Sequence, residues 1–315
     1  MLDEGPLLSK ADVEAAATRI AAHVRRTPTI TLEEGAFGLP NPIVLKLESQ
    51  QESGSFKARG AFSLLTTSDL SGGVVAASGG NFGLAIGYAA RMLGAKADVF
   101  VPDSVPPAKL SRIRAEGAIV HVVPGYYPDA LAASHDFARD CSGLFAHAYD
   151  QVPVAAGQGT CGLELLDQCQ EVETIVTAVG GGGLLSGLLA ACDDQARVIG
   201  VESEGCGSLN AALQAGAPVD IEVSGLAASA LGASRVGTIA WSLRDRIGDS
   251  LVVSDDDLVA AQRGLWEAAR VAAEPAAAAP LAALMSGAYV PAAGEVVALI
   301  VSGANFDPTD LRLLD

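Results

Sequence analysis

The feature that most constrains the fold is the alternation, along most of the chain, of short apolar runs with segments of helical periodicity. A short apolar run bounded by turn-forming residues fits a strand buried on both faces, and the intervening segments are long enough to form helices. Few hairpin dipeptides separate the runs, so successive strands are joined by helices, as a parallel sheet requires. The predicted strands are 43–47, 74–77, 97–101, 119–122, 144–146, 174–179, 198–202 and 296–301.

Helices are predicted between these strands and next to them. Two helices begin with capping-box spacing, in which Ser9 precedes Asp12 and Ser254 precedes Asp257. So many strand–helix units exceed what one compact sheet holds. We therefore expect an α/β protein with two lobes, each a mostly parallel sheet flanked by helices. The predicted helices are 9–23, 56–65, 81–93, 107–116, 129–139, 157–169, 184–191, 254–271 and an alanine-rich one over 272–283.

The charge balance excludes some classes of partner. The chain has 315 residues with 20 basic and 37 acidic side chains, a net charge of −17. Nucleic acids and anionic membranes need a basic surface, so we expect neither and predict a small-molecule ligand. Two uncharged stretches, 174–192 and 275–294, contain four consecutive glycines and three prolines respectively, so neither is expected to span a membrane. Five cysteines without a CxxC pair indicate reduced thiols in a cytoplasmic protein.

Small, glycine-rich loops follow several predicted strands, at the sheet edge where ligands bind in open α/β folds. Four successive glycines, Gly180 to Gly183, stand at the start of a predicted helix, where backbone N–H groups can cradle an anion. No complete GxGxxG pattern and no Gly-Lys pair is present, so the cradle suits one phosphate rather than a dinucleotide or a nucleoside triphosphate. A tight turn with close helix packing explains the same glycines equally well.

Lys57 stands at the first turn of a predicted helix, inside a polar loop. Neighbouring helix dipoles and a pocket would lower its pKa and favour the neutral amine, although a solvated surface lysine is the commoner case. A phosphate cradle together with such a lysine is what pyridoxal phosphate requires.

Several motifs together resemble one family, the threonine/serine dehydratase (threonine ammonia-lyase) branch of the fold-type II pyridoxal-phosphate enzymes. The run 53–61 around Lys57 resembles its Schiff-base lysine motif, and Ser78-Gly79-Gly80-Asn81 resembles its asparagine loop. The other similar motifs are Ala156-Gly157-Gln158-Gly159-Thr160, Val179 through Gly183, Glu274-Pro275 and Ser302-Gly303-Ala304-Asn305, in family order from Pro28 to Asp307.

The resemblance implies a role for each matching residue. Lys57 forms the Schiff base and moves the Cα proton, Phe56 packs beside the ring, and Asn81 donates to the ring's 3′-oxygen. Ser302 meets the pyridine nitrogen. The backbone amides of Gly180, Gly181, Gly182, Gly183 and Leu184 bind the phosphate. The backbone amides of Ser78, Gly79, Gly80, Asn81 and Phe82 hold the substrate carboxylate.

The resemblance also implies a fold like that of the tryptophan synthase β-chain, in a homodimer. The large cofactor-binding domain would comprise 1–68 and 149–315, and a small mobile domain, 69–148, would carry the asparagine loop. The family's divalent-cation site resembles Glu202, Cys206 and Ser208, but a serine replaces the expected aspartate, so we assign no metal.

The implied activity is β-elimination from L-threonine, L-serine or a related 3-hydroxy amino acid, giving a 2-oxo acid and ammonia. Serine or aspartate racemisation, or β-replacement, is the alternative within the superfamily. Racemases of this branch tend to carry a serine where this chain has Gly79, which has no proton to give, so we expect little racemisation. A third possibility, a non-catalytic amino-acid sensor, has no need of the set Lys57, Asn81 and Ser302.

Overall fold

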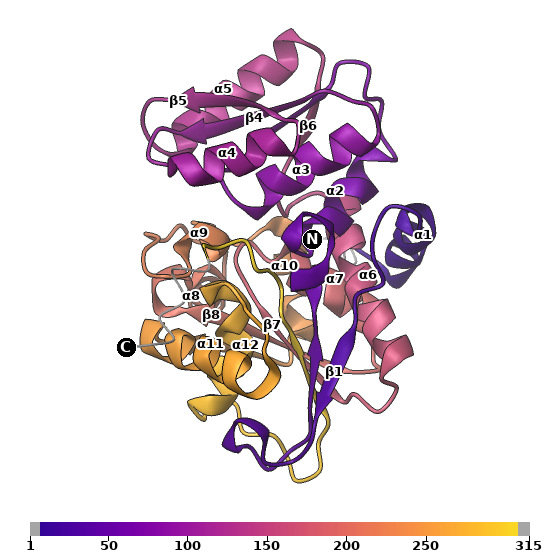
Figure 1. Ribbon diagram of the computed structural model, residues 1–315, viewed down its shortest axis with the longest axis vertical. Coiled ribbons are helices and arrows are strands. Elements are labelled where there is room, and N and C mark those ends of the chain that lie inside the picture. The colour runs from indigo at the N-terminus through magenta and orange to yellow at the C-terminus, as the bar shows by residue number, and fades with distance from the viewer. Residues whose placement is uncertain (1–6, 308–315) are drawn as a thin grey trace.

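The computed structural model, which describes residues 7–307, contains two sheets in two lobes, one above the other in Figure 1. The larger sheet has six strands in the order β1-β2-β10-β7-β8-β9, all parallel except for the antiparallel pair β1 and β2. This confirms the predicted α/β class and the two parallel-sheet lobes. These strands are β1 (Thr29–Leu32), β2 (Ile43–Lys46), β7 (Thr174–Ala178), β8 (Arg197–Ser203), β9 (Asp249–Val253) and β10 (Val297–Ile300).

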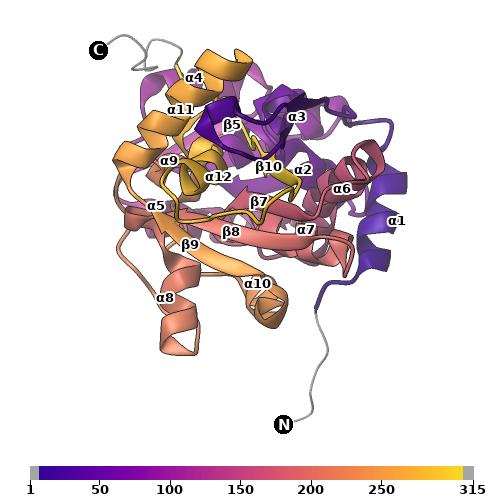
Figure 2. The ribbon, with the colours of Figure 1, turned by 90° about the horizontal axis from the view of Figure 1, so that it is seen from below.

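Helices cover both faces of the six-stranded sheet (Figure 2). Side chains alternate along each strand: Val44 packs with one set of helices, whereas Ile43 and Leu45 pack with the other. The first set is α1 (Lys10–Ile20), α6 (Val152–Gln168), α7 (Gly183–Cys192) and α10 (Thr238–Ser242), and the second is α11 (Asp255–Ala269) and α12 (Pro275–Met285).

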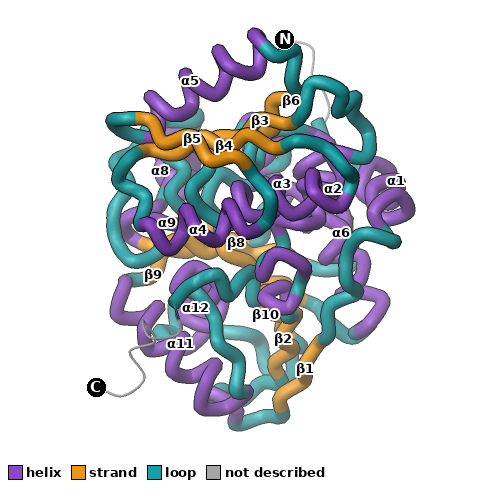
Figure 3. The backbone as a smooth tube through the Cα atoms, turned by 45° about the horizontal axis from the view of Figure 1, so that its top comes forward, coloured by secondary structure: helices purple, strands orange, loops and turns teal. Residues whose placement is uncertain are grey.

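The smaller sheet has four parallel strands in the order β5-β4-β3-β6. Figure 3 shows α5 on one side of this sheet and α3 and α4 on the other. The strands are β3 (Val74–Ala77), β4 (Ala97–Pro102), β5 (Ile119–Val123) and β6 (Leu144–Ala146), and the helices are α3 (Asn81–Met92), α4 (Pro107–Ala115) and α5 (Tyr127–Asp140).

The lysine-bearing helix α2 (Lys57–Leu65) joins the two lobes. Its apolar residues, among them Phe62 and Leu65, pack in one core with Val74 of β3, while the helix also lies against α6. The four-stranded sheet lies within 74–146, but its core thus extends into α2. The domain division at 68/69 and 148/149 stays a prediction, and its outermost parts, 1–6 and 308–315, lie outside the described residues.

Most predicted elements agree with the structure within a few residues, and the exceptions have physical causes. Helix α6 begins at Val152 rather than 157, because Gly157 and Gly159 lie inside it. A Cβ on Gly157 would come within 2.5 Å of the Arg59 carbonyl oxygen, so this glycine allows α6 and α2 to approach closely. The elements not predicted are β1, β9, α8 (Ser208–Ala215), α9 (Ala228–Leu231), α10 and the 3-10 helices η1 (Ala36–Gly38), η2 (Glu48–Gln50), η3 (Glu52–Gly54), η4 (Glu204–Cys206) and η5 (Arg244–Arg246).

Within residues 7–307, none of the helices has both the length and the apolar composition needed to span a bilayer. All five cysteines are unpaired thiols, and four of them are buried.

Candidate active site

Lys57 is the first residue of α2, and the loop before it runs beside the loop that follows β10. The Phe56 N–H donates to the Ser302 carbonyl oxygen at 3.0 Å, and Ser55 pairs with Gly303 as an isolated bridge. The structure therefore brings together the predicted lysine, its neighbouring phenylalanine and Ser302, although the lysine and the serine lie 245 residues apart in the chain (302 minus 57).

The amino group of Lys57 lies in a partly buried, largely apolar setting. Its Nζ donates to the Ala148 carbonyl oxygen at 2.9 Å and lies 5.0 Å from the ring centre of Phe56 and 5.6 Å from that of Phe82. Burial lowers the pKa of Lys57 to about 8, although the carboxylate of Glu274 opposes this shift. With that pKa, roughly a tenth of the amine is neutral at pH 7, far more than for an ordinary lysine.

A buried ion cluster directly behind Lys57 fixes α2. Arg59, which is fully buried, donates to both oxygens of Glu48 and to both oxygens of Glu164 over 2.7–2.8 Å, and to the Thr160 hydroxyl at 3.1 Å. Lys46 completes the cluster through Glu164 at 3.0 Å, so two basic and two acidic groups balance. Because Glu48 begins the loop that Arg59 closes, this pairing holds the loop that presents Lys57.

The glycine loop presents free backbone N–H groups in a buried position. Its carbonyls are already bonded, since Gly180 O accepts from Ser208 Oγ at 3.2 Å and Gly181 O accepts from the Gly237 N–H at 3.0 Å. Among residues 7–307, no acceptor faces the N–H groups from Gly180 to Leu184. A Cβ on Gly181 would lie 2.4 Å from the Tyr149 ring, so glycine is required there. This loop fits a phosphate group.

The asparagine loop leads into α3 and has the same character. The Gly80 N–H donates to the Ser78 hydroxyl at 3.3 Å, and within the described chain the N–H groups of Asn81 and Phe82 face no acceptor. A Cβ on Gly79 would lie 2.6 Å from a methyl group of Val105, so a side chain at this position has no room. The loop offers donors to an anion, as a substrate carboxylate requires.

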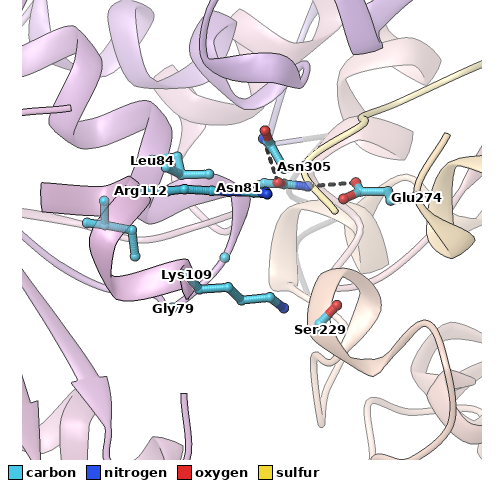
Figure 4. A pocket seen from close by; sticks show the side chains of 10 residues that line it. Gly79, Asn81, Leu84, Lys109, Arg112, Ser229, Glu274 and Asn305 are labelled. Atoms are coloured by element: carbon cyan, nitrogen blue, oxygen red, sulfur yellow. Dashed lines mark hydrogen bonds between the residues drawn. The ribbon is translucent and has the colours of Figure 1, made fainter. Parts of the chain in front are cut away.

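The Asn81 side chain reaches across to the other lobe (Figure 4). Its Nδ2 donates to Glu274 Oε1 at 2.7 Å, and its Oδ1 accepts from Asn305 Nδ2 at 2.9 Å. Burial raises the pKa of Glu274 to about 7, although the bond from Asn81 works against that rise. These residues line a pocket between the lobes together with Gly79, Gly80, Leu84, Lys109, Arg112, Ile113 and Ser229.

Three of these residues carry no signal in the sequence. Lys109 and Arg112 stand on the amphipathic helix α4 and read as ordinary surface cations, and Ser229 lies in the short helix α9. Glu274 was part of a motif, but nothing in its neighbourhood along the chain indicated that it faces Asn81.

The three weak metal candidates are engaged with the backbone. The Glu202 carboxylate accepts the N–H groups of Leu209 and Asn210, both at 2.8 Å, and thereby caps α8. Cys206 Sγ contacts the Ser224 carbonyl oxygen at 3.4 Å, and Ser208 contacts the glycine loop as described above. No cluster of three or more His, Cys, Asp or Glu side chains that could hold a metal occurs between residues 7 and 307.

Comparison with known proteins identifies the family. The family model described as "Pyridoxal-phosphate dependent enzyme" matches residues 20–303, which include the lysine, glycine-loop and asparagine-loop residues. The chain belongs to this family. Pyridoxal phosphate is accordingly its cofactor, and the free N–H groups of the glycine loop and the low-pKa amine of Lys57 fit its phosphate and its aldehyde.

Individual relatives cover nearly the whole chain. The L-threonine ammonia-lyase of Geobacter sulfurreducens is 33% identical over 302 residues, covering 94% of this chain and 75% of the relative. A solved bacterial-type structure, the T.th. threonine deaminase, is 34% identical with a TM-score of 0.87, covering 95% of this chain and 99% of that one. Maize serine racemase is 29% identical with a TM-score of 0.90, covering 96% and 95%. Both lyases and racemases of this family thus share the fold.

Proposed function

We propose that the protein is an ammonia-lyase that acts on L-threonine, L-serine or a related 3-hydroxy amino acid. Water is eliminated across the Cα–Cβ bond, the released enamine tautomerises to an imine, and the imine takes up one water to give the 2-oxo acid and ammonia. The observation that carries the proposal is the partly buried Lys57 amine, held between two phenylalanine rings beside the glycine and asparagine loops. The names of the lyase relatives support the same reaction.

The residues of the chain divide the work as follows. When bound, pyridoxal phosphate supplies a carbonyl carbon that condenses with amines and a conjugated ring that withdraws electrons from the substrate Cα. The N–H groups of the glycine loop would hold its phosphate, with Ser302 at the ring nitrogen, Phe56 beside the ring and Asn81 at the 3′-oxygen. The N–H groups of the asparagine loop would orient the substrate carboxylate.

Lys57 is the proposed proton carrier. Its lowered pKa makes the amine able both to accept a proton and to return one near neutral pH. Phe56 and Phe82, whose rings lie close to Nζ, reduce the access of water to that proton.

Racemisation is the second candidate, favoured by the similarity to maize serine racemase. It requires a proton donor on the opposite face of the substrate. Gly79 supplies none, and Val105 fills the space into which a side chain there would point. β-Replacement and non-catalytic sensing rank lower, because no feature of the described residues favours either over elimination.

The test is a product assay on the purified protein loaded with cofactor. Release of 2-oxo acid from L-threonine or L-serine, at a rate at least about tenfold above enantiomer exchange, supports the lyase. Exchange of L- and D-serine faster than 2-oxo acid release would establish the racemase instead. Turnover of neither, with the cofactor bound, would favour the sensor.

We also propose that the protein works in the cytoplasm as a homodimer, with domains 1–68 plus 149–315 and 69–148. The five unpaired thiols are consistent with a reducing compartment. Light scattering coupled to size exclusion, giving twice the 31.8 kDa chain mass, would support the dimer, and a mass of one chain would contradict it.

A further inference from the structure

A directed series of hydrogen bonds runs from the loop that presents Lys57 to a buried carboxylate in the same lobe, through the asparagine loop of the other lobe. The Ser53 carbonyl oxygen accepts from Asn305 Nδ2 at 2.7 Å, and the same nitrogen donates to Asn81 Oδ1 at 2.9 Å. Asn81 Nδ2 then donates to Glu274 Oε1 at 2.7 Å. Figure 4 shows Asn81 between Asn305 and Glu274.

The chemistry of the two ends fixes the direction of every bond in this series. The Ser53 carbonyl can only accept, so the NH2 end of Asn305 must face it. The second hydrogen of that NH2 group points to Asn81, so Asn81 must offer its oxygen there. Its own NH2 end therefore faces Glu274, whose ionised carboxylate can only accept. Asn81 keeps one free N–H, and its direction is set by groups outside the loop.

Glu274 is held for this task rather than for its own helix. It is the N-cap residue of α12, yet its side chain does not cap that helix. It is 6% exposed, and it also accepts the backbone N–H of Asn305. The cationic groups that act on it are Lys57 and Lys109, one from each side of the pocket. An ionisable carboxylate buried in this way costs folding free energy, so its retention calls for another explanation.

We propose that Glu274 is a positioning residue, which together with Asn305 fixes the amide of Asn81 so that its free N–H is directed into the cofactor site. The proposal rests on the proposed function in that Asn81 belongs to that site, but it does not depend on the substrate. It also explains how the asparagine loop of the small lobe keeps a defined position against the large lobe.

The experiment measures cofactor affinity by absorbance titration of the apoprotein with pyridoxal phosphate, and the urea midpoint of each apoprotein. Glu274→Leu removes the acceptor, and Asn305→Asp keeps the shape but turns a donor into an acceptor, which forces Asn81 to flip. Both are expected to raise the Kd of the cofactor about tenfold or more and to shift the absorption band of the bound cofactor. The matched control, Glu267→Leu, changes an exposed glutamate on α11 and should leave the Kd within about twofold.

The two readouts separate positioning from a structural role. We expect the urea midpoint of apo Glu274→Leu to stay at the wild-type value or to rise, because a buried carboxylate has been removed. A Kd within twofold of wild type in both variants would overturn the proposal, and so would a Kd that changes only in proportion to a lowered urea midpoint. If Glu274→Leu does not fold, Asn305→Asp decides by the same criteria. A wild-type protein that binds the cofactor but turns over no hydroxy amino acid would refute the proposed function alone.

Discussion

Removal of the guanidinium at Arg59 should cost a large part of the protein's stability. In Arg59→Met the buried carboxylates of Glu48 and Glu164 lose their principal partner, and only Lys46 still faces Glu164. Glu48, which is fully buried, keeps just the hydroxyl of Thr27. An uncompensated buried charge is the state that folded proteins tolerate least.

The magnitude follows from the geometry of the cluster. Breaking a buried pair by removing one partner costs about 3–5 kcal/mol, a large share of the roughly 5–15 kcal/mol that stabilises an ordinary protein. The double variant Arg59→Met/Glu48→Gln removes one charge of each sign and leaves Lys46 paired with Glu164. It should therefore be less destabilised than the sum of the two single variants, by about 2 kcal/mol.

Urea unfolding of the apoproteins, followed by circular dichroism, measures these changes. Burial would raise the pKa of Glu48, but the Arg59 guanidinium holds it below its ordinary value. Wild type should therefore gain stability from Glu48 above about pH 4.5, and lose it as the pH falls through the lowered value. Arg59→Met should lack this acid dependence. An Arg59→Met cost below about 1 kcal/mol, or strictly additive single variants, would refute the role of the cluster.

Three further predictions concern the site. Gly181→Ala places a Cβ within 2.4 Å of the Tyr149 ring and should weaken cofactor binding in an absorbance titration at least about tenfold, while Gly207→Ala, with no contact closer than 4.0 Å, should not; equal affinities would contradict the packing argument. Gly79→Ser should destabilise the protein by about 1–3 kcal/mol through its clash with Val105, and adding Val105→Ala should restore most of the urea midpoint; no rescue would place the strain elsewhere. Burial raises the pKa of Glu202 to about 7, so its contribution to stability is complete below pH 4.5 and declines by about 3 kcal/mol as the pH rises through 7; Glu202→Gln should flatten that decline, and an unchanged pH profile would count against it.

Local patterns in the sequence suffice for the parts of the fold that depend on local causes. Strands β3 and β6 agree residue for residue with the predicted runs 74–77 and 144–146, because each is a short apolar run between turn-forming residues. The capping boxes at Ser9 and Ser254 also form as predicted. Strand β9 was missed because this edge strand begins with the polar pair Asp249-Ser250, and its exposed face hides the alternation.

The parts of the site that depend on distant contacts could not be predicted from the residues alone. The hydrogen bond between Asn81 and Glu274 joins residues 193 positions apart, and no periodicity records such a contact. The position of Tyr149 over the glycine loop likewise follows from the return of the chain between the lobes. The resemblance indicated which motifs matter, and the structure adds the partners that orient them.

The most direct test of the account is to identify the lysine that binds the cofactor. The protein is loaded with pyridoxal phosphate, reduced with borohydride, digested and analysed by mass spectrometry. The account predicts one modified peptide carrying the label on Lys57, and loss of both the label and 2-oxo acid release in Lys57→Ala. A label on another lysine, or a Lys57→Ala variant that still releases 2-oxo acid at the wild-type rate, would contradict it.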